Sequence, residues 1–326
     1  MSAESAADAV FSIREAGGKA FVVLGAMNFG KRIDEKTARP IIAHAVARGV
    51  RLVDTANAYN EGASEEIVGR ALRDHPELLV ATKVGFARVA GKQEGLAPAR
   101  VLAACDESLA RLGVSTVALY YLHAPDHATT LDRTLGAVRR LLDAGKIARW
   151  GMSNYASWQI LEAMTFADRT GMPRPAVSQV IYNPLVRPIE VEYARFTQSY
   201  PIHTTVYNAL AGGLLSGKHR ADVDPPKGTR FDHNAFYRKR YWTKRFFEQV
   251  AAYEEVSRDL GISLVALSYA WLAARPVVDS VLVGPTSVAQ LDDALDGLAR
   301  DLPPEIVKRM DDIHRDFQGT DAVYAR

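Results

Sequence analysis

Four residues whose side chains can donate, accept or hold a proton stand at or just after the ends of three consecutive strand-like runs. They are Asp54, Tyr59, Lys83 and His123, and the runs cover residues 51–54, 78–83 and 117–123. Helical stretches separate the runs. Because the carboxyl ends of parallel strands open onto one face of a fold, we expect the four side chains to lie close together.

Together these residue types suit proton delivery to a carbonyl oxygen during its reduction. A phenol such as Tyr59 ordinarily titrates near pH 10, so it transfers protons poorly at neutral pH. A neighbouring Lys83 ammonium should lower that pKa by roughly 1–3 units, and the Asp54 carboxylate can keep the ammonium charged. A neutral His123 imidazole can hydrogen-bond the oxygen on which charge develops.

Each residue alone also has a structural explanation. A strand-end aspartate often caps a turn or a helix, and a single lysine is usually a solvated surface charge. A histidine at the end of an apolar strand can be a core residue, and a tyrosine can pack at the rim. The occurrence of all four in this order on successive strands favours catalysis.

The elements that must hold these residues alternate between short β-branched runs and amphipathic helical stretches. Strands are expected near residues 21–25, 51–55, 78–84, 117–122, 147–152, 176–181, 202–207 and 279–283. Helices are expected near 35–48, 64–74, 99–112, 131–143, 157–168, 190–199, 243–259, 263–274 and 287–298. Eight strands, each followed by a helix, predict an α/β fold, the (β/α)8 TIM barrel, as one domain over residues 1–326. A doubly wound nucleotide-binding fold is the alternative, but no Gly-x-Gly-x-x-Gly follows the first strand.

Three segments add to a minimal barrel. Residues 11–20, with an Ala-Gly-Gly turn, suggest a short N-terminal hairpin before the first strand. Residues 211–242 form a long excursion after the seventh strand, and loops of this length usually bind ligands or cover sites. Residues 303–317 predict a final helix with proline near its first turn. We therefore expect long loops on the C-terminal face of the barrel.

The composition argues against several other classes of protein. The chain has 326 residues, 48% of them hydrophobic, with a formal net charge of +2, and it lacks the arginine stripe or basic tail that would predict nucleic-acid binding. No apolar run approaches roughly 18 residues, the length that crosses a membrane, and no secretory signal is visible. The single cysteine, Cys105, suits a reducing cytosol and is expected to be a packing thiol. These observations predict a cytoplasmic protein.

The sequence resembles the aldo-keto reductase family over nearly its whole length. The similarity rests on the strings Asp54-Thr55-Ala56-Asn57-Ala58-Tyr59, Ser64-Glu65-Glu66, Thr82-Lys83-Val84, Gly145-Lys146-Ile147 and Gly151-Met152-Ser153-Asn154. The resemblance implies that Tyr59 donates the proton, that Lys83 and Asp54 tune it, and that His123 orients the carbonyl. It also implies that NADPH supplies the hydride from an extended pose across the barrel mouth, without a metal ion. The pair His123 and His127 has no third ligand at a suitable spacing for zinc.

The same resemblance implies a set of dinucleotide contacts. Ser153, Asn154 and Gln179 would hold the nicotinamide carboxamide, and Tyr207 would stack on the ring. Ordinary strand-end packing is the alternative for Gln179 and Tyr207. The other expected cofactor contacts are Met27, Asn208, Leu210, Gly212, Gly213, Leu214, Gly217, Lys218, Gly284, Thr286, Ser287, Gln290 and Asp293.

The expected phosphate contacts fall on two segments. Residues 212–218 nearly match the phosphate loop of nucleoside triphosphatases, but His219 replaces the Ser or Thr that would hold magnesium. Backbone amides of the Gly-Gly-Leu-Leu turn can still cradle a pyrophosphate. Residues 284–287 lead into a helix whose N-terminus favours anions, although Thr286 and Ser287 can equally serve only to cap that helix.

Two departures from the family pattern concern the choice of dinucleotide. Gln290 stands where many members carry an arginine for the 2′-phosphate, and Ala294 replaces a common adenine-contacting asparagine. The semialdehyde-reductase branch also carries glutamine at the first of these positions. We therefore expect NADPH as the cofactor, with NADH as the alternative.

Further strings resemble the aflatoxin-aldehyde and succinic-semialdehyde reductase branch of the family, namely residues 123–127, 153–158, 211–218 and 240–242. Arg230 and the terminal Arg326 match arginines that this branch places near the substrate, where they would favour a carboxylate at the far end of an aldehyde. A chain end without function is the alternative for Arg326. Met27, Tyr59 and Trp242 are candidate apolar walls, with packing inside the long loop as the alternative for its aromatic residues.

The sequence thus predicts an NADPH-dependent reductase of aldehydes or ketones, with semialdehydes or dialdehydes favoured and tyrosine as proton donor. A ketoreductase of sugar or secondary metabolism is a second hypothesis. A nucleotide-sensing regulatory protein, similar to the potassium-channel β-subunits of the superfamily, is a third, and residues 227–247 would then be partner surface. The branch that the chain resembles commonly dimerises, so a homodimer is also expected.

Overall fold

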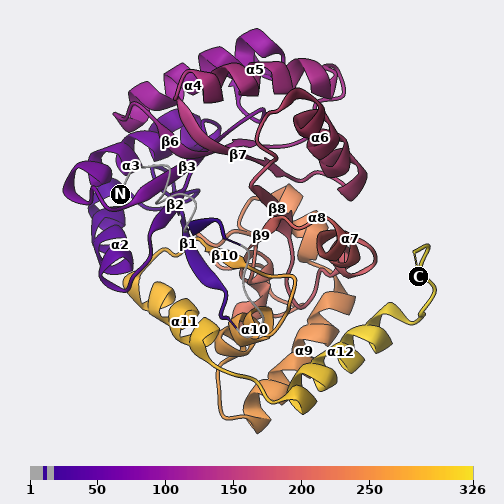
Figure 1. Cartoon of the computed structure of the whole chain (residues 1–326). Coiled ribbons are helices and arrows are strands. Elements are labelled where there is room, and N and C mark those ends of the chain that lie inside the picture. The colour runs from indigo at the N-terminus through magenta and orange to yellow at the C-terminus, as the bar shows by residue number, and fades with distance from the viewer. Residues whose placement is uncertain (1–9, 13–17, 326) are drawn as a thin grey trace.

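A closed barrel of eight parallel strands forms the centre of the molecule, and helices surround it (Figure 1). The structure is a computed structural model and describes residues 10–12 and 18–325. The barrel strands are β1 (Phe21–Gly25), β2 (Leu52–Asp54), β3 (Leu79–Val84), β6 (Val117–Leu122), β7 (Ile147–Ser153), β8 (Val177–Ile181), β9 (His203–Tyr207) and β10 (Ser280–Val283). They pair in the order β1, β10, β9, β8, β7, β6, β3, β2. The predicted (β/α)8 TIM barrel is confirmed.

The helices follow the strands as the sequence predicts. They are α2 (Glu35–Ala47), α3 (Ala63–Asp74), α4 (Pro98–Leu112), α5 (Leu131–Asp143), α6 (Ser157–Thr170), α7 (Tyr193–Ser199), α8 (Ala235–Tyr241), α9 (Lys244–Asp259), α10 (Leu264–Ala273), α11 (Val288–Ala299) and α12 (Pro304–Gln318). Three 3-10 turns, η1 (Tyr59–Gly62), η2 (Pro188–Glu190) and η3 (Ala211–Ser216), lie in the loops. The seven-residue helix α8 was not predicted.

Alternation along the strands explains why they form a barrel with two apolar layers. In β1, Val22 and Leu24 belong to the layer between the strands and the helices. Val23 belongs to the layer inside the barrel, where it meets Leu52 and Tyr121. Because successive side chains of a strand point to opposite faces, strands buried on both faces must be apolar throughout.

Capping residues set the ends of several helices. Asp34 precedes α2 and accepts a hydrogen bond from the backbone N–H of Thr37 at 2.9 Å. Ser263 does the same for Ala266 at the start of α10, at 3.0 Å. Gly113 ends α4 in a left-handed conformation, with φ 67°. These residues fix where each helix begins or ends relative to the strand that precedes or follows it.

Loops after β3 and β9 add structure beside the carboxyl ends of the strands. After β3 the chain forms a small antiparallel hairpin from β4 (Arg88–Val89) and β5 (Lys92–Gln93). After β9 the long excursion contains η3 and α8. The predicted N-terminal hairpin includes residues 13–17, which lie outside the described residues. Within the described part of the chain, every helix is too short or too polar to cross a membrane.

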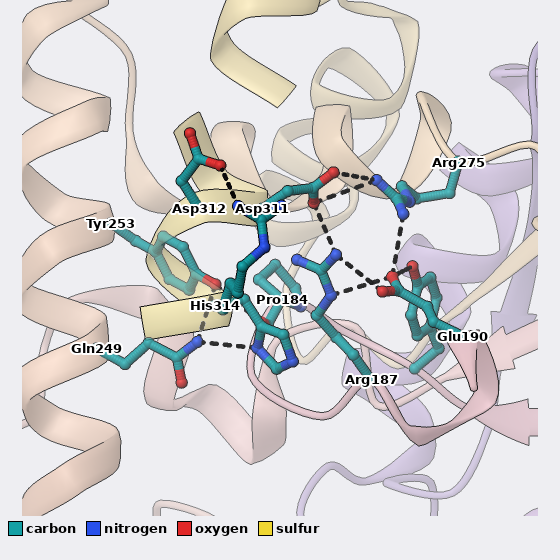
Figure 2. Close-up of polar contacts among 11 residues, drawn as sticks. Pro184, Arg187, Glu190, Gln249, Tyr253, Arg275, Asp311, Asp312 and His314 are labelled. Atoms are coloured by element: carbon teal, nitrogen blue, oxygen red, sulfur yellow. Dashed lines mark hydrogen bonds and ion pairs between the residues drawn. The ribbon is translucent and has the colours of Figure 1, made fainter. Parts of the chain in front are cut away.

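An ion network attaches α12 to the loop after β8. Arg187, whose side chain is 4% exposed, donates to Glu190 at 2.9 Å and to Asp311 of α12 at 2.7 Å. Arg275 donates to the same two carboxylates, at 3.1 and 3.0 Å (Figure 2). Two cations therefore face two anions, which is the condition under which charges can be held away from water.

Candidate active site

The four residues singled out for catalysis gather at the carboxyl ends of neighbouring strands. Asp54 is the last residue of β2, and Lys83 is the penultimate residue of β3. His123 follows β6 directly, and Tyr59 opens the turn η1 after β2. Since β2 pairs with β3 and β3 pairs with β6, the strands alone bring Asp54, Lys83 and His123 to one edge of the barrel.

The ammonium group of Lys83 lies at the centre of the hydrogen bonds of the site. It donates hydrogen bonds to the carboxylate of Asp54, to the backbone carbonyl of Thr55 at 2.8 Å and to the hydroxyl of Tyr59 at 3.4 Å. Lys83 is 0% exposed and Asp54 is 1% exposed. The second oxygen of Asp54 accepts from Gln179 at 3.0 Å, so the buried carboxylate is bonded on both sides.

Aromatic contacts hold the imidazole of His123 beside Tyr59. The two rings meet edge to face, with 5.7 Å between their centroids. The ring of Phe86 also meets His123 edge to face, at 4.8 Å. Within the described residues, the buried Nδ1 atom of His123 has no hydrogen-bond partner. Ring contacts thus position the imidazole beside Tyr59.

Burial and the neighbouring charges set the protonation states of this site. Burial raises the pKa of Tyr59 above its usual value and outweighs the opposing effect of Lys83. Lys83 acts to lower the pKa of Tyr59, as predicted, but burial makes the net shift an increase. Burial acts to lower the pKa of Lys83, but Asp54 and Tyr59 outweigh it, so this pKa lies above its usual value. Burial, aided by Lys83, holds the pKa of His123 well below its usual value.

At neutral pH these shifts give a protonated Tyr59, a charged Lys83 and a neutral His123. A phenol that carries its proton, next to a fixed cation, is ready to act as a general acid. The cation would stabilise the phenolate that forms when the proton leaves. The arrangement can therefore deliver a proton to an oxygen on which negative charge develops.

The residues expected to hold a nicotinamide lie next to these four. Ser153 is the last residue of β7 and Tyr207 the last residue of β9. The hydroxyl of Tyr207 donates to Asn154 Oδ1 at 2.6 Å, and Asn154 Nδ2 donates to the backbone carbonyl of His123 at 2.9 Å. Gln179 of β8 reaches Asp54, as described above. Amide groups and one aromatic ring thus form a continuous polar set with the proposed catalytic residues.

The expected phosphate turn is the segment η3. Asn208 holds it by accepting from the backbone N–H of Gly212 at 2.7 Å. Gly212 and Gly213 have φ values of 71° and 105°, which glycine adopts readily. A Cβ atom on Gly212 would lie 2.8 Å from the ring of Tyr237, so α8 packs directly against the turn. Of the remaining expected contacts in 210–218, Leu214 is buried, Lys218 is exposed, and Leu210 and Gly217 are half-buried.

The start of α11 carries the second group of expected phosphate contacts. Ser287 caps the helix by accepting from the backbone N–H of Gln290 at 3.3 Å. The side-chain oxygen of Gln290 in turn accepts from the N–H and the hydroxyl of Thr286, at 2.9 and 3.0 Å. Gly284 and Asp293 are exposed. The capping explanation for Ser287 therefore holds, and a helix N-terminus of this kind also attracts anions.

These donors fit a nicotinamide dinucleotide by their chemistry. A carboxamide requires paired donors and acceptors, which Asn154 and Gln179 carry. A flat ring requires an aromatic face such as that of Tyr207. The two segments expected to contact phosphates, a glycine turn and a helix N-terminus, follow the neighbouring strands β9 and β10.

The residues predicted to contact substrate differ in the groups that surround them. Arg230 donates to Asn28 at 2.9 Å and to the hydroxyl of Tyr237 at 3.0 Å. Met27 is 44% exposed and contacts Arg230 through its sulfur. Trp242 packs against the rings of His219, Phe231 and Phe247, with centroid distances of 5.3, 5.0 and 5.0 Å. Trp242 therefore packs inside the long loop, which is one of the two explanations left open for it. Arg326 lies outside the described residues.

Sequence reasoning missed several residues that shape the site. Phe86 contacts His123, and Asn28 links Arg230 to the carbonyl of Gly284, to which it donates at 3.0 Å. Glu94 accepts hydrogen bonds from Asn57, in the loop after β2, and from Gly85, in the loop after β3. Each lies in a loop, where neither periodicity nor a known motif distinguishes it from a surface residue.

A barrel with this buried lysine–aspartate pair, tyrosine and histidine at its mouth belongs to the class of barrel oxidoreductases. A family model described as "Aldo/keto reductase family" matches residues 22–315. The chain belongs to this family, whose members generally use NADH or NADPH.

Curated relatives support the same assignment. Aflatoxin B1 aldehyde reductase member 2 of Rattus norvegicus is 33% identical over 84% of this chain and 78% of the relative. Human aldo-keto reductase family 7 member A3 is 32% identical over 84% of this chain and 87% of the relative. A probable voltage-gated potassium channel subunit beta of Arabidopsis thaliana is 30% identical over 82% and 83%. The similarity to the aldehyde-reductase branch is confirmed.

Proposed function

We propose that this protein reduces aldehydes or ketones to alcohols with NADPH, and that Tyr59 donates the proton. The observation that supports this most is the hydroxyl of Tyr59 lying 3.4 Å from the ammonium of Lys83 and beside the imidazole of His123. A tyrosine placed between a cation and a neutral imidazole has the geometry of a general acid for a carbonyl oxygen.

Each residue of the set has a separate part in the proposed reaction. A bound reduced nicotinamide supplies the hydride. Tyr59, protonated at neutral pH, gives its proton to the carbonyl oxygen, and Lys83 stabilises the phenolate left behind. Asp54 keeps Lys83 charged and fixed. The neutral imidazole of His123 donates a hydrogen bond to the carbonyl oxygen and so orients it.

The dinucleotide would be held by the residues at the ends of β7 to β10. We assign Ser153, Asn154 and Gln179 to the carboxamide, Tyr207 to the ring, and the segments 212–218 and 284–290 to the phosphates. NADPH is the proposed form because Gln290 uses its side-chain oxygen on Thr286, which leaves the amide NH2 for a 2′-phosphate. The exposed ammonium of Lys218 adds a positive charge on the phosphate turn.

Aldehydes with a second polar end are the proposed substrates. The name of the rat relative specifies aldehyde reduction, which supports an aldehyde here. Arg230 bonds to neutral oxygens of Asn28 and Tyr237, and no carboxylate pairs with it among the described residues. Its charge is therefore available to a substrate carboxylate, as in a semialdehyde.

The test is consumption of NADPH or NADH by the purified protein with a panel of short semialdehydes, dialdehydes and bulky ketones. We expect turnover of four-carbon semialdehydes with NADPH, and a loss of about 10²–10⁴-fold in kcat for Tyr59→Phe. Tyr200→Phe is the control, because Tyr200 is an exposed residue at the end of α7. Unchanged turnover by Tyr59→Phe would refute the assignment of the proton donor.

A regulatory function is the second candidate, because the chain is also similar to a probable potassium channel subunit beta. It predicts tight NADPH binding with negligible turnover of the whole panel. Binding measured by fluorescence, in parallel with the turnover assay, separates the two functions.

A further inference from the structure

Glu94 is a buried carboxylate beside the proposed catalytic residues. Its side chain is 0% exposed, although it lies in the loop between β5 and α4. One oxygen accepts from the backbone N–H groups of Gly85 and Ala87, at 2.7 and 3.0 Å. The other accepts from Arg100 at 2.8 Å, and both contact the amide of Asn57, at 2.9 and 3.1 Å. Glu94 is therefore bonded to three separate segments.

Two of these segments carry Tyr59 and Phe86, the residue whose ring contacts His123. Asn57 lies two residues before Tyr59, and its own backbone N–H donates to the carbonyl of Lys83 at 3.3 Å. Gly85 and Ala87 flank Phe86, whose ring contacts His123. A single carboxylate thus joins the loop that carries Tyr59 to the loop whose aromatic ring contacts His123.

Local packing alone does not require a carboxylate at this position. Removing a carboxylate from water is costly unless donors satisfy both oxygens, and an apolar side chain fills the same space without that cost. A pair with Arg100 alone would leave the oxygen that faces Gly85 and Ala87 unused. The four donors are best explained by a need to fix the two loops relative to each other.

We propose that Glu94 is a positioning residue that sets the distance between Tyr59 and His123 across the site. The inference rests on the proposed reductase function, since the two side chains must reach the same carbonyl oxygen. A displacement of about 1 Å in such a pair can reduce a rate about 10²-fold. Glu94 would act through the loops and would not touch the substrate.

The test compares Glu94→Ala, Glu94→Gln and Glu107→Gln in the full chain. Glu107 binds the same Arg100, at 2.6 and 2.7 Å, but its side chain is 45% exposed. Among the described residues it has no hydrogen bond to either loop. We expect Glu94→Ala to lower kcat by about 10–100-fold, while the Kd for NADPH changes less than about twofold and the solvent isotope effect on kcat rises. Glu94→Gln should recover part of kcat, because its carbonyl can still accept from Gly85 and Ala87. Glu107→Gln should behave as the wild type.

Hydrogen exchange measured by mass spectrometry gives a readout that is independent of activity. We expect faster exchange in residues 55–60 and 85–95 of Glu94→Ala and of Glu94→Gln, with wild-type exchange elsewhere. If Glu94→Ala does not fold, Glu94→Gln decides the matter with the same two measurements. Wild-type kcat and wild-type exchange in the variant that folds would overturn the proposal, as would a loss of kcat that only matches a loss of folded protein. A wild-type protein that reduces no carbonyl would refute the proposed function instead, and the exchange result would still show whether Glu94 joins the loops.

Discussion

Replacing Lys83 with methionine removes the charge at the centre of the site while keeping most of the unbranched side chain. Asp54 would then be a buried carboxylate that still accepts a hydrogen bond from Gln179. Breaking a buried ion pair by removing one partner costs about 3–5 kcal/mol. Loss of the bond from Lys83 to the carbonyl of Thr55 adds about 1 kcal/mol. We therefore expect the free energy of unfolding to fall by about 4–6 kcal/mol.

Urea unfolding of a double-mutant cycle measures this effect. The single variants are Lys83→Met and Asp54→Asn, and the double variant carries both changes. Because asparagine removes the unpaired charge, the double variant should be more stable than the sum of the two single effects by about 1–3 kcal/mol. A loss below about 1 kcal/mol for Lys83→Met, or strict additivity in the cycle, would refute the claim that these two charges form a buried, coupled pair.

The pH dependence of the same difference follows from the raised pKa of Lys83. A group whose pKa is higher in the folded than in the unfolded protein contributes its full stability below the unfolded value. That contribution is lost only as pH rises through the higher folded value, and the usual value for lysine is 10.5. Burial also raises the pKa of Asp54, and Lys83 is the main group that opposes this shift. The Asp54 carboxylate of Lys83→Met should therefore take up a proton as pH falls. The stability difference between wild type and Lys83→Met should shrink on acidification and be largest at alkaline pH, below the loss of the Lys83 charge.

Other residues give predictions of different kinds. Burial and Lys83 hold the pKa of His123 well below its usual value, so the folded protein excludes a proton that the unfolded chain binds. Wild type should therefore lose stability as pH falls from about 6.5 to 5, and His123→Gln should lose less over the same range in urea titrations. Arg187→Met should lower the free energy of unfolding by about 3 kcal/mol, because it leaves Glu190 and Asp311 with one cation between them; Arg174→Met, which breaks an exposed pair, should leave the urea midpoint unchanged. Burial raises the pKa of Cys105 to about 12, so iodoacetamide should leave the folded protein unmodified, as judged by intact mass, and alkylate it only after unfolding. Each assignment has a result that would contradict it. For Cys105 it is alkylation of the native protein, and for His123 it is an equal loss of stability with falling pH in His123→Gln and wild type. For Arg187 it is an unchanged free energy of unfolding in Arg187→Met.

The barrel could be predicted because its strands and helices carry strong local patterns. The run 117–122 is apolar at every position, as expected for a parallel strand buried on both faces, and the structure buries all six residues. Strand order then follows from alternation with helices, since a strand–helix–strand unit places the next strand beside the last. For the same reason the three strand ends that carry Asp54, Lys83 and His123 could be placed together.

The loops were predicted less completely because their structure depends on contacts that no local pattern records. The strands β4 and β5 have two residues each, all exposed, so they show no alternation to detect. The helix α8 spans seven residues inside a long loop, and its position depends on the packing of its Tyr237 ring against Gly212 of the preceding turn. Glutamate is usually a surface residue, and the donors that satisfy the buried carboxylate of Glu94 come from three separate loops and helices.

The net shift in the pKa of Tyr59 also could not be predicted from the sequence. The presence of Lys83 correctly indicated a neighbouring cation, but the net shift depends on how deeply the hydroxyl is buried. Burial and a nearby cation act in opposite directions on a phenol. Their balance requires the positions of the surrounding side chains, which only the structure supplies.

The most direct test of carbonyl reduction by this site follows deuterium from cofactor to product. NADPH that carries deuterium at both C4 positions of the nicotinamide is incubated with a semialdehyde, and the alcohol is analysed by mass spectrometry. We predict one deuterium on the carbinol carbon with the wild-type protein, and about 10²–10⁴-fold slower formation of the labelled alcohol with Tyr59→Phe. Alcohol without the label, or labelled alcohol formed equally fast by Tyr59→Phe, would contradict the role of this site.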